Sequence, residues 1–343
     1  MRQNGGEIIG MGTYGCVFKP PLKCKKKTRK KKGISKLMNW STGLDELLIT
    51  QELFKKLETI PNYKKYVIVS KQFCIPDKLS RKDEMQMQRK CDEHIVNDYK
   101  NNNELIVHNQ PYGGKNLHMV LKETSTLTET EKLATLTDIT VKLKDLLLNC
   151  INPMHKVNVY HTDIKPHNLV LNKKTIKMID WGLAVINIPV SHYNIIHFNR
   201  PYESILLGLD ESASIEQIEK YIDRELKKYN ENILDEPIKN DLLWFFSNPM
   251  NELNATTVKK YINMIGKEFS KRGKFDKKAF VKNYYKKQDY WGLVYCYIDI
   301  LRTLNIESND IKVKILDLCN LMVSGGVIKM KDIVKKMDKV QGA

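Results

Sequence analysis

The sequence predicts an α+β fold with a small strand-rich first part and a larger helical second part. Strand patterns dominate before residue 110, whereas helical periodicity dominates after about residue 204. The chain has 343 residues, more than one small domain needs, and 42% of them are hydrophobic, which is enough to bury a core. We therefore expect two parts, residues 1–110 and 111–343.

The composition favours an intracellular protein. The formal net charge is +17, from 57 Lys and Arg against 40 Asp and Glu. No apolar run reaches the roughly 18 residues of a membrane span, and residues 1–10 lack the apolar segment of a signal peptide. The seven Cys are odd in number, without a Cys-x-x-Cys pair, which predicts reduced thiols and no zinc framework.

The first part alternates short strands with turns. A helix with regular apolar spacing is expected at Asp45–Leu57, and Pro61 ends it. Residues 77–103 are polar and charged, which indicates a loop with some helix. Strands are predicted at Glu7–Ile9, Cys16–Phe18, Ile34–Met38, Val67–Val69 and Leu105–Val107.

The second part begins after Gly113 and Gly114. Thr128–His155 has the periodicity of one long helix. Leu169–Leu171 and Ile176–Ile179 are expected to form a hairpin. The remainder of the chain is predicted to be almost wholly helical.

A glycine-rich turn lies between the first two expected strands. Gly10-Met11-Gly12-Thr13-Tyr14-Gly15-Cys16-Val17 reads G-x-G-x-x-G-x-V, and glycines let backbone N–H groups approach phosphates. A dinucleotide-binding loop would open into a helix, whereas a strand follows here. By itself, the pattern also fits an ordinary β-hairpin turn. The candidate nucleotide contacts are Ile9, Gly10, Met11, Gly12, Thr13, Tyr14, Gly15, Cys16 and Val17.

Residues 161–168 read His-Thr-Asp-Ile-Lys-Pro-His-Asn and match H-x-D-x-x-x-x-N. Phosphoryl transfer to a hydroxyl needs a carboxylate that accepts the proton, for which Asp163 is the candidate. Asn168 supplies an oxygen for Mg²⁺, and Lys165 can reach the transferred group. Twelve residues later, Asp180-Trp181-Gly182 occupies the place of a second metal-binding motif, with Asp180 as the ligand.

With these three motifs in order, the chain resembles the eukaryotic-type protein kinase family over nearly its whole length. The resemblance implies a bilobal fold with ATP in its cleft, Mg²⁺ or Mn²⁺ as cofactor, and protein substrates bearing Ser or Thr. It also implies a strand lysine that contacts the α and β phosphates and a helix glutamate that pairs with it. Lys36 is the expected lysine, and Glu46 is preferred over Glu52 as its partner.

Further motifs extend the resemblance. The backbone of residues 109–112 is expected to meet the adenine, with Val107 or His108 at the gatekeeper position. Arg200–Glu203 stands where Ala-Pro-Glu ends the activation segment, and Asp289–Leu293 is similar to the start of the large central helix. The intervening residues, about 204–288, form an expected helical insertion, which is the main departure from the family.

Less diagnostic residues look like those of serine/threonine kinases of large nucleocytoplasmic DNA viruses. They are Thr13–Leu22, Ile34–Met38, Ile60–Tyr63 and Phe198–Glu203. This resemblance implies a viral protein in the host cytoplasm or the virion, with the nucleus as an alternative through a basic import signal.

Thr162 stands where the family has an arginine that binds a phosphate on the activation loop. Ser191 is the one Ser or Thr between Asp180 and Glu203. We therefore expect activity that does not depend on phosphorylation of this loop.

Eight of the ten residues in Lys23–Lys32 are Lys or Arg. This run fits a solvated loop, a contact with nucleic acid or an anionic surface, an import signal, or a preference for acidic substrates. Two alternatives to an active kinase remain: a pseudokinase scaffold, and a nucleic-acid-binding protein with a kinase-derived fold. Binding of ATP and Mg²⁺ would distinguish an active kinase or a pseudokinase from a nucleic-acid-binding protein. A phosphate-transfer assay would distinguish the active kinase from the pseudokinase.

Overall fold

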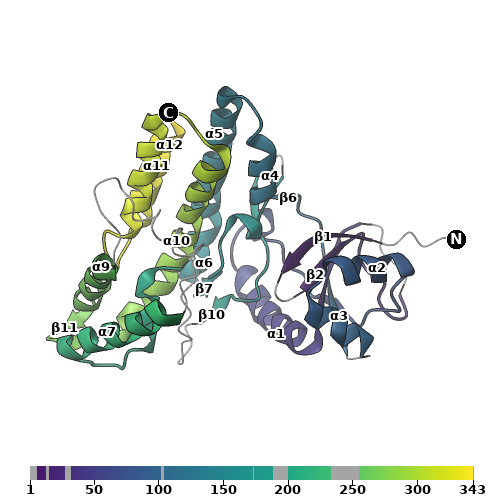
Figure 1. Cartoon of the computed structure of the whole chain (residues 1–343), viewed down its shortest axis with the longest axis horizontal. Coiled ribbons are helices and arrows are strands. Elements are labelled where there is room, and N and C mark those ends of the chain that lie inside the picture. Colours follow the sequence, from purple (N-terminus) through teal and green to yellow (C-terminus); the bar gives the residue numbers. More distant parts are fainter. Residues whose placement is uncertain are drawn as a thin grey trace. The chain divides into compact units, whose positions relative to one another are not determined.

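The structure is a computed structural model, and it describes residues 6–12, 15–27, 32–101, 104–172, 174–187, 200–232 and 255–342. Its chain divides into two compact units (Figure 1). One unit comprises Met1–Gly114 with Lys177–Gly182, and the other comprises Lys115–Ile176 with Leu183–Ala343. The sequence places the division at residue 110 and gives no sign that residues 177–182 belong to the first unit.

The first unit contains a five-stranded sheet in the order β1-β2-β3-β5-β4. Four of the five expected strands lie in it, but the strand predicted at Val67–Val69 is wrong. Val67 makes a single bridge to Met178, and the Ile68 amide donates to the Met178 carbonyl instead of joining the sheet. The strands are β1 (Glu7–Gly12), β2 (Gly15–Lys19), β3 (Ile34–Asn39), β4 (Gln72–Cys74) and β5 (Leu105–Gln110).

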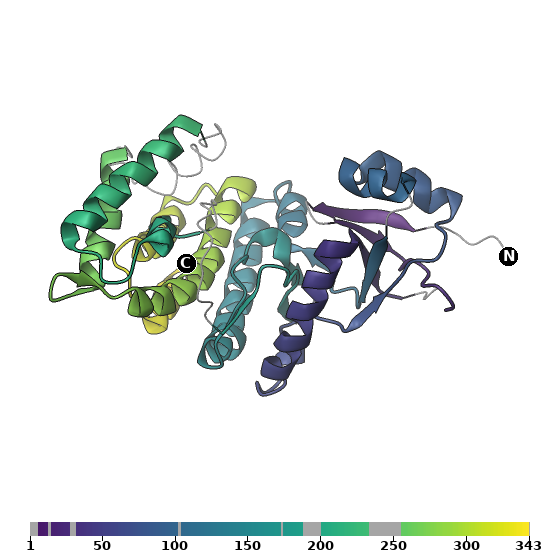
Figure 2. The same cartoon turned by 90° about the horizontal axis from the view of Figure 1, so that it is seen from below.

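Helices cover both faces of this sheet (Figure 2). Helix α1 (Trp40–Leu57) packs on the face that carries Ile106, where a Cβ on Gly43 would lie 1.8 Å from the Ile106 side chain. Helices α2 (Arg81–Lys90) and α3 (Glu93–Lys100) pack on the opposite face. Residues 77–103 are thus more helical than expected, because Ser80 and Asp92 cap two short helices. A 3₁₀ turn, η1, spans Tyr63–Lys65.

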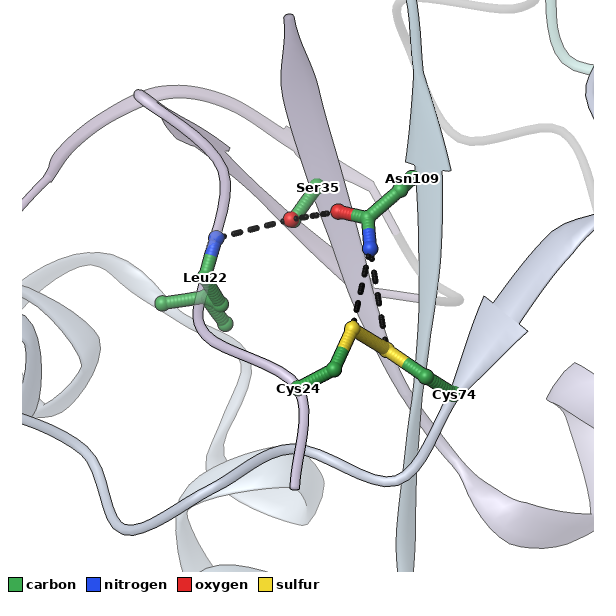
Figure 3. The surroundings of a disulfide bond; sticks show 5 residues. All are labelled: Leu22, Cys24, Ser35, Cys74 and Asn109. Atoms are coloured by element: carbon green, nitrogen blue, oxygen red, sulfur yellow. Dashed lines mark hydrogen bonds between the residues drawn. A yellow bond between two sulfur atoms is a disulfide. The ribbon is translucent and has the colours of Figure 1, made fainter. Parts of the chain in front are cut away.

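Two disulfides link parts of the first unit. Cys16 on β2 is bonded to Cys91 after α2, and Cys24 is bonded to Cys74 on β4. In Figure 3 the Asn109 amide lies beside both sulfurs of the second disulfide. The expectation of reduced thiols is wrong for these four, because the partners are 75 and 50 residues apart in sequence and come together only when the first unit has folded. Cys150, Cys296 and Cys319 are free and buried.

The second unit is built around helix α10 (Lys277–Leu304), which is buried along most of its length. Every residue from Lys287 to Ile298 is buried, so this stretch of α10 is surrounded by the core on all sides. The predicted helix at 128–155 is present as α5 (Glu129–Leu146), a π-helical turn η2 (Leu147–Ile151) and α6 (Asn152–Lys156) without interruption. Figure 1 also shows α4 (Leu117–Thr124), α11 (Asn309–Met322) and α12 (Met330–Gln341).

The insertion is partly as expected. Its described residues form the 3₁₀ turn η4 (Tyr202–Gly208), α7 (Ile215–Asn232), α9 (Ala255–Glu268) and a hairpin of β11 (Ser270–Lys271) and β12 (Lys274–Phe275). Asp289 does not begin the central helix, since α10 starts at Lys277. The other described elements are short: β6 (Lys115–Asn116), β7 (Val159–Tyr160), η3 (Pro166–Asn168), β8 (Leu169–Leu171), β9 (Ile176–Met178) and β10 (Val185–Ile186).

Across the described ranges, no helix combines the length and the apolar character that a membrane crossing requires.

Candidate active site

The glycine-rich turn is a β-hairpin between β1 and β2. The two strands pair from Glu7 opposite Lys19 to Gly12 opposite Gly15. A Cβ on Gly15 would lie 2.4 Å from the Leu37 carbonyl oxygen, so only glycine lets β2 approach β3 this closely. Thr13 and Tyr14 lie outside the described residues.

The hairpin presents two faces with different surroundings. Val17 lies opposite Lys36 in the sheet, so these two side chains share a face. Cys16 points to the other face, where it is buried and bonded to Cys91. Any contact of Cys16 with a nucleotide is therefore confined to its backbone. Ile9 and Met11 on β1 are exposed.

Lys36 lies at the centre of a cluster of charges. Its Nζ is 2.8 Å from Glu46 Oε2 and 2.9 Å from Asp180 Oδ1. Burial alone would lower the pKa of Lys36, but the negative charges of Asp180 and Glu46 outweigh burial and raise it. Lys36 is therefore a cation held between two carboxylates. Lys19, at the end of β2, lies over the Tyr112 ring, 3.4 Å from its centroid.

Glu46 rather than Glu52 is the partner of Lys36 in this structure. Glu46 is buried on α1, whereas Glu52 is exposed on the same helix. The second carboxylate oxygen of Glu46, Oε1, lies 3.1 Å from Nδ1 of His108. The other ring nitrogen of His108, Nε2, lies 2.5 Å from the Ser70 carbonyl oxygen. Burial would raise the pKa of Glu46, but the His108 hydrogen bond and the Lys36 charge together lower it.

His108 is one of the two residues expected at the gatekeeper position. It is buried on β5, and its ring stacks on Phe73 with the centroids 4.0 Å apart. Its contact with Glu46 was not foreseen, because it joins residues 62 positions apart. The contact follows from the register that places His108 opposite Lys36 on β3, and no sequence signal marks that register.

Asp180 takes a backbone conformation that few residues adopt. Its φ is +62°, in the left-handed region that Asp tolerates better than most side chains. The next residue, Trp181, is buried and donates from Nε1 to the Ile68 carbonyl, 3.2 Å away. This bond fixes the chain beside Asp180, whose side chain stays 40% exposed.

In the second unit, the sequence-predicted residues Asp163, Lys165 and Asn168 lie together. Lys165 Nζ is 2.8 Å from Asp163 Oδ2. Asn168 Nδ2 donates to the same Oδ2 at 2.8 Å and to the Asp163 carbonyl at 2.9 Å. The Asp163 carboxylate is thus oriented from two directions by residues of its own loop, with Asn168 placed by η3.

Helix α10 holds the backbone of this loop. Asp289 is fully buried, and its carboxylate accepts from the amides of His161 and Thr162 and contacts His155 Nε2. One residue earlier, Gln288 Nε2 donates to the Thr162 carbonyl at 2.6 Å. These contacts satisfy buried peptide groups and preorganise the residues that precede Asp163.

Gly292 completes this attachment. A Cβ at Gly292 would lie 2.4 Å from the Ile164 carbonyl oxygen, so the helix can meet the loop only with glycine there.

Thr162 also contacts the segment that follows Asp180. Its hydroxyl donates to the Leu183 carbonyl at 2.5 Å, and β10, which comes next, pairs with β7. The φ of Thr162 is +60°, which is unusual for a β-branched residue. The strained backbone persists because hydrogen bonds hold the amide, the carbonyl and the hydroxyl.

Two other expected features are only partly described. In the basic run, Lys23 pairs with Asp77 at 2.7 Å, and the Lys25 amide donates to the Ile75 carbonyl. Residues 28–31 of the run, together with Ser191 and Phe198, lie outside the described residues.

The family model for the protein kinase domain matches residues 4–204, more than half of the chain. The chain belongs to the protein kinase family. The match includes the glycine-rich turn, Lys36, Glu46, the 161–168 loop and Asp180, and it ends just after Glu203.

Curated relatives of this kinase-family chain are distant. It is 35% identical over 66 residues to a probable casein kinase II subunit alpha homolog of Encephalitozoon cuniculi, covering 19% of the chain and 21% of the relative. It is 26% identical over 182 residues to calcium-dependent protein kinase 3 of Plasmodium yoelii yoelii, covering 52% of the chain and 26% of the relative. The chain thus spans about a quarter or less of these relatives.

Proposed function

We propose that the protein is an ATP-dependent protein serine/threonine kinase. The observation that carries the proposal is the contact of Lys36 with both Glu46 and Asp180, which leaves a charged lysine beside a half-exposed carboxylate. In this proposal Lys36 binds the α and β phosphates of ATP, and Glu46 holds its ammonium group in place. The glycine-rich turn from Ile9 to Val17 covers the phosphates with its backbone.

The residues fit a divalent metal that is bound largely by the substrate. In the described part of the chain, no three His, Cys, Asp or Glu side chains gather into a metal cluster. Mg²⁺ usually takes one or two protein ligands, with phosphates and water completing its shell. Asp180 and Asn168 each offer such an oxygen, and the bound ion would neutralise phosphate charge.

Asp163 acts as the proton acceptor in the proposed reaction. Its carboxylate, held by Asn168 and Lys165, orients the substrate hydroxyl and takes its proton as the oxygen bonds to the γ-phosphorus. The bond from that phosphorus to the β–γ bridging oxygen breaks, and ADP leaves. Lys165, beside Asp163, stabilises negative charge on the transferred group.

We also propose that activity does not depend on phosphorylation of the activation loop. Thr162 cannot bind a phosphate as an arginine does, but its hydroxyl bonds directly to the Leu183 carbonyl. This bond and the β7–β10 pairing tie the start of the segment to the catalytic loop without a phosphate.

Origin and location remain proposals of the same kind. The motifs that resemble those of large DNA viruses support a viral kinase in the host cytoplasm or virion. Lys25, Lys26, Lys27 and Lys32, which are exposed among the described residues of the basic run, support a weak contact of the run Lys23–Lys32 with nucleic acid or an anionic surface.

Transfer of radiolabelled phosphate from ATP to dephosphorylated casein tests the central proposal, with wild type beside Asp163→Asn. The variant removes the proton acceptor, so the rate should fall by about 10² to 10⁴ while ATP binding is retained. Wild type that binds ATP without transferring phosphate would indicate a pseudokinase scaffold. A variant as fast as wild type would remove Asp163 from the mechanism.

A further inference from the structure

The Glu46 carboxylate is held at both of its oxygens, by side chains from two different strands. Lys36 on β3 contacts Oε2 at 2.8 Å, and Nδ1 of His108 on β5 lies 3.1 Å from Oε1. The side chains of His108 and Glu46 are only 2% and 5% exposed, so little water can reach this contact. A rotation of the carboxylate would break both contacts together. The group that fixes Oε1 therefore also fixes the oxygen that faces Lys36.

The His108 ring is itself fixed on two other sides. One face of the ring stacks on Phe73 of β4, with the centroids 4.0 Å apart and the ring planes at 10°. Its Nε2 lies 2.5 Å from the Ser70 carbonyl oxygen. A carbonyl oxygen only accepts hydrogen bonds, so Nε2 carries a proton.

The contact with Glu46 requires a second proton on the ring. Without it, Nδ1 and the carboxylate oxygen would both present lone pairs, which repel at 3.1 Å. Burial would raise the pKa of Glu46, but the His108 hydrogen bond and the Lys36 charge lower it, so Glu46 stays ionised and the proton lies on Nδ1. Gln110 Nε2 is also 2.9 Å from Nδ1, and a half-turn of that amide group brings its oxygen to the N–H instead.

With this second proton, positive and negative charges alternate through the cluster. Asp180 contacts Lys36, Lys36 contacts Glu46, and Glu46 contacts His108. Two cations and two anions thus stand next to opposite charges, as buried ions must to persist. The remaining neighbours of the His108 ring, Phe73 on β4 and the Ser70 carbonyl, carry no charge.

We propose that His108 is a positioning residue, whose doubly protonated ring holds Glu46 in the orientation that presents Oε2 to Lys36. This inference rests on the proposed function, in which Lys36 binds the phosphates of ATP. Asp180 would leave Lys36 for the metal when ATP binds, whereas His108 contacts the other oxygen of Glu46 and can stay in place. His108 acts through Glu46, and this role needs no contact of its own with the nucleotide.

Two substitutions separate the functions of the two ring nitrogens. The amide nitrogen of Asn is as many bonds from Cβ as Nδ1 of histidine, and that of Gln is as many as Nε2. His108→Asn therefore keeps a donor for Glu46 and loses the donor for Ser70. His108→Gln keeps a donor for Ser70 and loses the donor for Glu46. A ring that only fills space would make the two variants equivalent.

The two variants should differ in how they bind and use ATP. His108→Gln should lower both kcat/KM for ATP and the affinity for ATP with Mg²⁺ about tenfold, the typical effect of losing a hydrogen bond to a charged group. KM for dephosphorylated casein should not change, because Lys36 does not contact the protein substrate in the proposed reaction. His108→Asn should behave like wild type. So should His94→Gln, the matched control, because His94 is an exposed histidine on α3 of the same unit.

The protons on the ring can be observed directly. Nitrogen NMR of protein labelled in its histidine rings, at neutral pH, should show two protonated nitrogens for His108. The His108 signals are those that disappear in His108→Asn. This measurement requires no phosphate transfer, so its outcome does not depend on the proposed activity.

The inference would be overturned by a His108→Gln variant with the ATP affinity of wild type, or by a His108→Asn variant that is equally impaired. A His108 ring with only one protonated nitrogen would also overturn it. If His108→Gln does not fold, the NMR spectrum and His108→Asn decide. Wild type that binds ATP without transferring phosphate would instead refute the proposed function, while the ATP affinities of the variants would still decide the role of His108.

Discussion

The two groups of candidate catalytic residues are held in different ways. In the first unit, Lys36, Glu46 and Asp180 are held by ion pairs between side chains. In the second unit, the loop before Asp163 is held through its backbone by Gln288 and Asp289. The first arrangement consists of charges that can exchange partners, and the second consists of buried peptide groups that cannot.

This difference suits the two tasks that we propose. Asp180 contacts Lys36 in the structure, yet both must turn to phosphate and metal when ATP binds, and exchanging one charged partner for another is readily reversible. Asp163 must meet a hydroxyl at a fixed position, so a rigid loop avoids reorganisation during the reaction. Mutations in the two groups should therefore change different kinetic constants.

Among the variants that compare how the two groups are held, Lys36→Met should have the largest effect. Loss of this cation should lower kcat/KM for ATP by about 10² to 10³, as loss of one electrostatic contact to the reacting group does. Because Lys36 and Glu46 form one ion pair, Glu46→Lys should cause a similar loss. Steady-state kinetics with varied ATP measures both.

Glu52→Lys provides the control on the same helix, since Glu52 is exposed. It should leave the ATP kinetics near wild type. A severe defect in Glu52→Lys with a mild one in Glu46→Lys would mean that the functional enzyme uses a different pair from the one observed.

Asp289→Asn should have a somewhat smaller effect, and it should lower kcat without changing KM for ATP. The amide that replaces one oxygen cannot accept from the His161 or Thr162 N–H, so the loop shifts and kcat falls by about 10². KM for ATP should stay constant. Asp299→Asn, on the same helix and paired with the half-buried His118, is the matched control. A raised KM for ATP in Asp289→Asn would contradict the separation of the two groups.

The basic run should affect binding of polyanions and leave catalysis unchanged. We expect Gln at Lys26, Lys27 and Lys32 to lower heparin retention and to flatten the salt dependence of nucleic-acid binding. Turnover on a small neutral peptide should not change. The control for net charge is a variant with Gln in place of three lysines that are exposed on α12, namely Lys331, Lys335 and Lys339. Equal effects of both sets would favour a solvated loop without a specific role.

Removal of phosphate from the protein should have the smallest effect on the initial rate. Enzyme made in bacteria and treated with a phosphatase is expected to keep its initial rate, and Ser191→Ala should be nearly silent. By contrast, Thr162→Val should lower kcat, because it removes the hydroxyl that bonds to Leu183. A large loss on phosphatase treatment, restored by a phosphate on Ser191, would contradict this regulation.

Much of the site could be predicted because its motifs are local in sequence. Asp163, Lys165 and Asn168 lie within six residues, so their proximity follows from one short loop. The glycine hairpin was predictable for the same reason, since both strands adjoin the turn. Lys36 could be identified by its strand pattern and its distance from the turn.

Contacts across the sheet or between distant helices could not be predicted in this way. His108 with Glu46, and Cys24 with Cys74, join residues 62 and 50 positions apart. No local pattern marks Lys287, because its partner Glu203 meets it only after α10 and η4 have packed. In each case the partner depends on strand register or helix packing, which one sequence does not specify.

Residues 177–182 have a consequence for how the protein is made. Met178 exchanges hydrogen bonds with Tyr66 and Ile68, and Trp181 bonds to Ile68, so the first unit is built from two separate stretches of chain. A ribosome delivers the chain from its N-terminus, one residue at a time. The first 114 residues therefore emerge without the strand end and indole that complete their fold, and without Asp180. The first unit can therefore complete its fold only after the loop bearing Asp163 has also been synthesised.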